Sequence, residues 1–172
     1  MKHNIVRINK IVLSNFKNVK KGIVEMPAYS GKELFSEKAD VLGLYGQNGS
    51  GKTSVVEALR FVKMLLSGEE LPADTKEYIA QGEEECEIDV SFSVAEEVQK
   101  ETVNYSVALK KDADGFVISH ERMTVVPRKE NIRSVESTLI DYQYDNEDVT
   151  FAPEYRYKKL VANDKKVRVA LN

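Results

Sequence analysis

The sequence predicts an α/β fold in which a strand, a glycine-rich loop and a helix pack with an antiparallel, β-rich part of the chain. Three observations lead to this prediction. The continuous apolar run Val41–Tyr45 enters a glycine-rich loop, as a buried strand would. Residues 53–67 then follow with helical periodicity. Beyond residue 82, stretches of alternating apolar and polar residues are separated by turn signals, which is typical of antiparallel strands.

The residues around the loop predict a strand pair and one helix. Ile5–Leu13 is β-branched and roughly alternating, residues 15–22 have the composition of a turn, and Ile23–Met26 is a second short strand. The apolar positions of Thr53–Ser67 cover most of the helix circumference, so we expect burial on more than one side. Gly68 is well placed to end this helix.

The C-terminal half predicts strands and hairpins. Glu85–Val94 alternates, with its apolar residues on one face. The turns Asp112–Gly115 and Asp145–Asp148 each lie between two such stretches and predict two hairpins. We therefore expect residues 1–172 to form one lobe with two parts, an αβ core in residues 1–82 and an antiparallel β subdomain in residues 83–172.

Composition excludes several classes of protein. The chain has 172 residues, 42% hydrophobic and 31% charged, as an ordinary globular domain does. No apolar run approaches the roughly 18 residues of a membrane helix, so no membrane partner is expected. The single cysteine, Cys86, forms no internal disulfide, which favours a cytoplasmic location. Residues 1–24 and 155–172 are basic and residues 69–101 acidic, which predicts either solvated faces of opposite sign or a basic edge that approaches nucleic acid.

One motif carries chemistry. GQNGSGKT, Gly46–Thr53, matches the pattern G-x-x-x-x-G-K-[ST] completely and lies between the predicted strand and helix. Its three glycines allow positive φ and let the backbone approach phosphate oxygens. The N–H groups then form an anion nest at the positive end of the helix dipole. Lys52 would reach the β- and γ-phosphates as the catalytic residue, and the Thr53 hydroxyl would ligate Mg²⁺. The residues expected to contact the nucleotide are Gly46, Gln47, Asn48, Gly49, Ser50, Gly51, Lys52 and Thr53.

The residues at the x positions resemble a known family. GQNGSGKTSVVEALRFV is similar to the loop and helix of ABC-type and AAA-family ATPase heads, above all the SMC, RecF and OLD-like group. INKIVLSNFKNV resembles the opening strand and the N-F-[KR] turn of these heads. YIAQGEEECEIDVSFSV is similar to their return into an antiparallel sheet, and YSVALKKDADGFVISHERM to the hairpin of OLD-like ATPases. The resemblance implies a P-loop NTPase fold, with this chain as its N-terminal half-domain.

The resemblance also implies ligands and further site residues. It implies that the loop binds ATP and Mg²⁺, and that Lys17, with Phe16 and Asn18, approaches the adenine or the phosphates. Glu57 is interpreted as a helix-surface or packing residue.

Hydrolysis in this class also needs an acidic strand ending in Asp-Glu, a signature loop of the L-S-G-G-[QE] type and a switch histidine. The nearest acidic strand ends at Asp141, where a tyrosine follows instead of Glu. LLSGEE, Leu65–Glu70, comes too early for a signature loop, so we interpret it as a helix C-terminus. His120 lies in a predicted strand and is therefore not interpreted as the switch histidine. Either Gln81 or Gln143 could be the metal-sensing glutamine, and their spacing does not choose between them.

These observations lead to a hypothesis and its alternatives. The chain is expected to be the N-terminal lobe of a longer ATPase, in DNA repair or phage defence, without turnover on its own. In the intact protein a C-terminal lobe would complete the head, and two heads would dimerise around ATP. The first alternative is a non-catalytic nucleotide-sensing or protein- and DNA-interaction module, for which Tyr155–Lys159 could stack bases and hold phosphates. A small-molecule P-loop kinase is less favoured because about 45 residues precede the loop, and a GTPase because no N-K-x-D motif exists.

Overall fold

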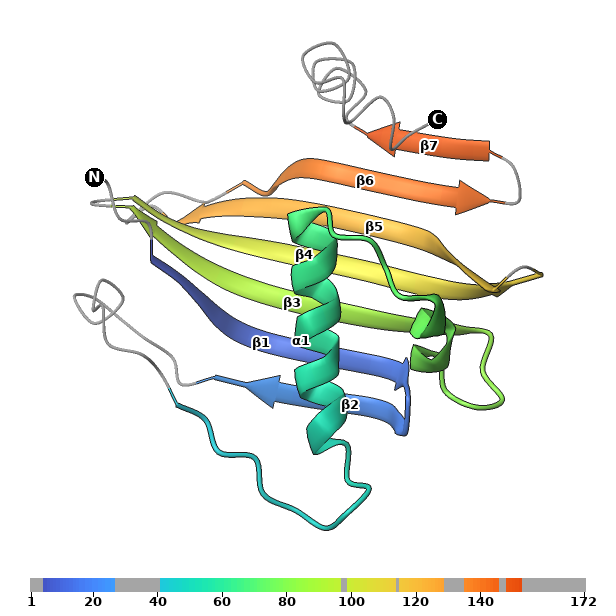
Figure 1. The fold of residues 1–172 in the computed structure, drawn as a ribbon. Helices are drawn as coiled ribbons and strands as arrows, with labels where there is room; N and C mark the ends of the chain where they lie inside the picture. Colours follow the sequence, from blue (N-terminus) through green and yellow to red (C-terminus); the bar gives the residue numbers. More distant parts are fainter. Residues whose placement is uncertain are drawn as a thin grey trace.

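The structure is one antiparallel sheet with a helix across one face. The computed structural model describes residues 5–26, 41–96, 99–113, 115–128, 135–145 and 148–152. The elements are β1 (Ile5–Phe16), β2 (Val19–Glu25), α1 (Lys52–Ser67), the 3₁₀ helix η2 (Ala73–Tyr78), β3 (Glu85–Glu96), β4 (Gln99–Asp112), β5 (Gly115–Arg128), β6 (Ser137–Asp145) and β7 (Asp148–Ala152). Seven strands pair in the order β2-β1-β3-β4-β5-β6-β7 (Figure 1).

The predicted N-terminal strand, the strand at Glu85–Val94 and the two hairpin turns are confirmed, whereas β2 begins at Val19, inside the stretch 15–22 that was expected to be a turn. β1 covers the alternating N-terminal stretch and pairs with β2, while β3 pairs with both β1 and β4. Asp112 pairs with Gly115 at the first predicted turn, and Asp145 with Asp148 at the second. Every pairing among the described strands is antiparallel. The strands of residues 5–25 and those of residues 85–152 therefore form one continuous sheet.

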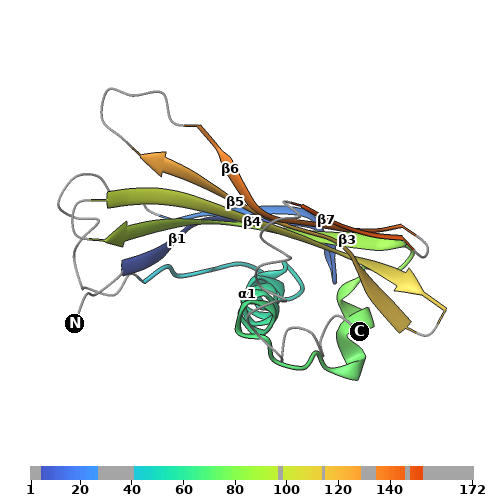
Figure 2. The same ribbon diagram turned by 90° about the horizontal axis from the view of Figure 1, so that it is seen from above.

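The core lies between α1 and the middle strands of the sheet (Figure 2). Leu13, Ile88 and Val107 are cross-strand neighbours on β1, β3 and β4, and each is at most 2% exposed. From the helix, Phe61 and Val62 pack against this face and are also buried. Removing this apolar surface from water stabilises the helix on the sheet, at roughly 25 cal/mol per Å².

Only one side of α1 is buried among the described residues, which corrects the expectation of burial on more than one side. Ser54, Ala58 and Phe61 recur at helical spacing on the buried side. On the other side Val56 is 63% exposed and Leu66 48% exposed. The sequence showed how apolar the helix is, but the sheet and Tyr78 of η2 pack against one side of it.

The predicted strand Val41–Tyr45 is wrong. These residues form no strand, and the side chains of Val41 and Tyr45 are 91% and 95% exposed. The segment lies beyond the β2 edge of the sheet (Figure 1). A strand needs a neighbour for its backbone N–H and C=O groups, and no described strand pairs with this segment. The helix after the loop is confirmed, since Thr53–Ser67 was expected and α1 spans Lys52–Ser67.

Candidate functional site

The glycine loop (Gly46–Thr53) connects the exposed segment to α1. Gly49 and Gly51 have φ values of 83° and 86°, a left-handed conformation that L side chains rarely adopt. Gly51 is the N-cap of α1 and supplies no side-chain cap, so the first N–H groups of the helix have no side-chain acceptor there. Gly46 does not have positive φ, contrary to expectation. A Cβ there would instead lie 2.8 Å from Ser50 Oγ, so this glycine allows a close approach.

The Lys52 ammonium group lies inside the loop. Its Nζ donates hydrogen bonds to Gly46 O at 2.7 Å and Gln47 O at 2.6 Å, and lies 3.2 Å from Ser50 Oγ. Three partners from one loop, all within hydrogen-bonding distance, surround a single cation. The cation therefore lies against two loop carbonyl groups and one hydroxyl, next to the positive end of a helix.

The turn between β1 and β2 contacts the glycine loop. Asn18 Nδ2 donates to Gly49 O, and Ser54 Oγ donates to Asn18 Oδ1 at 2.7 Å. A Cβ on Gly51 would lie 2.5 Å from Val19 Cγ2, so the valine is packed directly on the loop backbone. Asn18 was expected near the nucleotide as part of the N-F-[KR] turn, whereas contacts of Val19 and Ser54 at this place were not predicted. Ser54 directly follows the loop on α1, but its bond to Asn18 spans 36 residues of the chain, so no local signal in the sequence shows that the hairpin meets the loop.

Lys17 and Phe16 do not contact the glycine loop in this structure. Lys17 Nζ forms an ion pair with Glu57 Oε2 at 2.7 Å and lies 5.6 Å from the centre of the Tyr78 ring. Phe16 is fully buried, with its ring 5.1 Å from that of Tyr78. Glu57 is thus a packing and pairing residue on the helix surface. The Lys17 ammonium group lies over α1, one turn beyond the first residues of the helix.

A cavity of about 290 Å³ lies between the loop and the hairpin of β1 and β2. One wall carries Ser50, Gly51 and Lys52, and the other carries apolar residues that include Val19 and Ile23. A polar, cationic end beside an apolar wall is the chemistry of a pocket for a ligand with an anionic and an apolar part.

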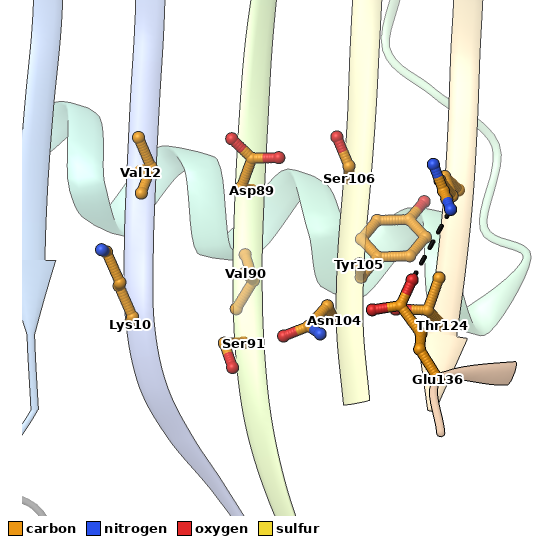
Figure 3. A pocket seen from close by; sticks show the side chains of 11 residues that line it. Lys10, Val12, Asp89, Val90, Ser91, Asn104, Tyr105, Ser106, Thr124 and Glu136 are labelled. Atoms are coloured by element: carbon orange, nitrogen blue, oxygen red, sulfur yellow. Dashed lines mark ion pairs between the residues drawn. The ribbon is translucent and has the colours of Figure 1, made fainter. Parts of the chain in front are cut away.

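The other predicted site residues lie elsewhere. His120 Nε2 is 3.3 Å from Asp141 Oδ1, and Asp141 pairs with Arg122 across β5 and β6. Arg122 lines a pocket of about 420 Å³ on the open face of the sheet, the face away from α1. Figure 3 shows this pocket, with Asp89 and Asn104 in front of the strands and α1 behind them. Asp141 and His120 therefore lie on the opposite face of the sheet from α1, the helix that follows the glycine loop.

The remaining motif residues lie at the end of α1, in the turn before β3, on β6 and outside the described residues. Leu65–Glu70 is a helix C-terminus, as expected, because α1 ends at Ser67 and Gly68 has φ 68°. Gln81 is exposed in the turn before β3, and Gln143 lies on β6. Tyr155–Lys159 lies outside the described residues. Within the described part of the chain, no group of three or more His, Cys, Asp or Glu residues could hold a metal ion.

The comparisons with known proteins bear on the loop. A family model described as "AAA domain, putative AbiEii toxin, Type IV TA system" matches residues 41–166, which is more than half of the chain and includes the whole glycine loop. The chain belongs to this AAA domain family. A search of curated proteins gives no match. Membership supports a nucleotide-binding, P-loop ATPase domain, although the AAA domain seen here is dominated by strands and has one α-helix among its described residues. No helix in the described ranges is long and apolar enough to cross a membrane.

Proposed function

We propose that the glycine loop binds the phosphates of ATP with Mg²⁺ and that the chain is the ATP-binding lobe of an SMC/RecF/OLD-like ATPase. The observation that carries this proposal is the position of Lys52 Nζ, 2.6–2.7 Å from two loop carbonyl oxygens at the start of α1. An ammonium group held there can move to the β- and γ-phosphates of an incoming nucleotide. Positive φ at Gly49 and Gly51 lets the loop backbone curve around them.

The remaining roles follow from the same placement. Thr53 lies in the first turn of α1 with an exposed side chain, so its hydroxyl would be available to hold Mg²⁺ when the nucleotide is bound. The cavity beside the loop has room for further parts of the nucleotide. We assign Lys17 to the nucleotide as well, which requires that it exchange Glu57 for a phosphate or the adenine when ATP binds.

Complete turnover needs groups from outside the described residues. The open face holds Asp141, so we propose that the acidic strand and the signature loop come from a C-terminal lobe and from a partner head. Exposed apolar residues support a further lobe that covers this side of the domain. More than 60% of the residue surface is exposed at Val41 and Tyr45 beside the loop and at Val56 on α1. The β4–β5 hairpin carries the resemblance to OLD-like ATPases and supports phage defence over DNA repair.

Calorimetry with Mg-ATP on the complete polypeptide tests the proposal. The wild type is expected to bind, Lys52→Ala to lose binding, and Lys63→Ala, an exposed lysine on the same helix, to bind as the wild type does. Equal null signals for the wild type and Lys52→Ala would remove the basis of the assignment. Turnover is expected in the complete polypeptide and not in residues 1–172 alone. Robust hydrolysis by the 172 residues would show that the lobe is already complete.

A further inference from the structure

Asn18 bridges two parts of the nucleotide site. Its Nδ2 donates a hydrogen bond to Gly49 O in the glycine loop, and its Oδ1 accepts one from Ser54 Oγ in the first turn of α1 at 2.7 Å. Ser54 is 3% exposed, so its hydroxyl is held in place by the packing of the helix. Asn18 itself is exposed at the turn between β1 and β2. One side chain therefore connects the hairpin, the loop and the helix.

The fold fixes the turn that carries Asn18. Lys17 N donates to Tyr78 O at 2.7 Å, and Ala80 N donates to Asn15 O at 2.8 Å. Asn15 and Lys17 have φ values of 51° and 52°, a conformation that costs free energy in residues other than glycine. Such strain persists where surrounding contacts over-determine the backbone. The segment after η2 thus holds the turn, and the turn directs Asn18 toward the loop.

The bond from Asn18 sets the orientation of one peptide group. In a trans peptide the C=O and the following N–H point in opposite directions. Because Gly49 O points to Asn18, the Ser50 N–H points to the inner side of the loop. There it donates to Gln47 O at 3.2 Å, the same oxygen that accepts a hydrogen bond from Lys52 Nζ at 2.6 Å.

We infer that Asn18 is a positioning residue for the nucleotide. By holding the Gly49 carbonyl outward, it keeps the Ser50 N–H on the inner side of the loop, where this N–H can exchange Gln47 O for a phosphate oxygen when the nucleotide binds. Ser54 acts through Asn18, because its hydroxyl donates to Asn18 Oδ1 and so helps to hold the amide beside Gly49. This inference rests on the proposed function of the glycine loop. It adds that the donor is oriented before the nucleotide arrives, so that binding does not have to order it.

Calorimetry on the complete polypeptide with Mg-ATP gives the test. Asn18→Ala is expected to raise the Kd about three- to tenfold, the effect of losing one well-placed hydrogen bond. Ser54→Ala is expected to raise the Kd less, since Asn18 can still reach Gly49. The double variant is expected to bind no more weakly than Asn18→Ala, because the effect of Ser54 passes through Asn18. Asn104→Ala, an asparagine on the open face, serves as the matched control and should bind as the wild type does.

A purely structural role for Asn18 gives a different result. The melting temperature of Asn18→Ala is expected to fall only slightly, because the Asn18 side chain is exposed and only the Ser54 hydroxyl loses a partner on a buried residue. A large fall in parallel with the loss of affinity would overturn the inference. Additive losses in the double variant, or an unchanged Kd in Asn18→Ala, would do the same. If the wild type binds, Lys52→Ala does not, and Asn18→Ala binds normally, the proposed function stands without this inference. If the wild type does not bind, both fail.

Discussion

Two apolar stretches of this chain differ in how much of their surface is exposed to solvent. Ile88 and Val90, on β3, are each 1% exposed beneath α1, whereas Val41 and Tyr45, ahead of the glycine loop, are more than 90% exposed. Both stretches have the composition of a buried strand. The difference lies in their neighbours, since β3 pairs with β1 and β4 while no described strand pairs with residues 41–45. An apolar segment is buried only where other parts of the chain pair with it or pack on it, so its composition alone does not determine its exposure.

The buried core and the segment around the glycine loop should also differ in how much they contribute to stability. The sheet and the buried side of α1 share one core, and the glycine loop is attached to that core through the helix and the β1–β2 hairpin. Functional loops commonly lie at the edge of a rigid scaffold. Changes in the core should therefore alter stability strongly, and changes in the segment before the loop should alter it little.

The largest effect is expected at Phe61. Its side chain is fully buried on the sheet side of α1, 5.5 Å from the Tyr78 ring, so Phe61→Ala should lower the free energy of unfolding by about 3–5 kcal/mol. Val56→Ala on the same helix, at a position 63% exposed, should cost less than about 0.5 kcal/mol. Urea unfolding of both variants measures the difference. Similar losses would mean that the other side of α1 is also packed in solution.

Alkaline pH should weaken the core next. Burial raises the pKa of the Cys86 thiol from 9.0 to about 12, and burial, followed by the charge of Glu121, raises the pKa of Tyr105. Both groups bind their protons more tightly when folded, so their contribution is complete below about pH 9 and is lost as the pH rises from 9 toward 12. The unfolding free energy should fall by about 1.4 kcal/mol per pH unit for each group that titrates. Cys86→Ala should make this decline shallower, and an unchanged slope would contradict the assignment to Cys86.

Gly51 and Gly49 offer a matched pair in the loop. Both have positive φ, so alanine at either position should cost about 1–2 kcal/mol of backbone strain. At Gly51 the new Cβ would also lie 2.5 Å from Val19 Cγ2, whereas at Gly49 nothing lies within 4 Å. Gly51→Ala should therefore be the more destabilising change, and Val19→Ala should partly rescue it. Equal losses at the two glycines, measured by thermal unfolding, would show that the hairpin does not press on the loop.

These contrasts show what could be predicted from the sequence. The alternation of Cys86, Ile88 and Val90 predicted a buried face, and Gly68 predicted the end of α1, because both signals are local. The pattern of Gly46–Thr53 predicted a loop at a helix start for the same reason. The contacts of Asn18 and Val19 with that loop could not be predicted, since they depend on how the hairpin packs. The exposed state of Val41–Tyr45 could not be predicted either, because it depends on which strands are present to pair with it.

The smallest expected effect tests the comparison most directly. Val41→Ser together with Tyr45→Ser should change the free energy of unfolding of residues 1–172 by less than about 0.5 kcal/mol, because both side chains are already more than 90% exposed. Ile88→Ala should cost about 2–5 kcal/mol in the same background, since that side chain is 1% exposed. If the serine variants lose 2 kcal/mol or more, the segment packs against something in solution and the two stretches are alike.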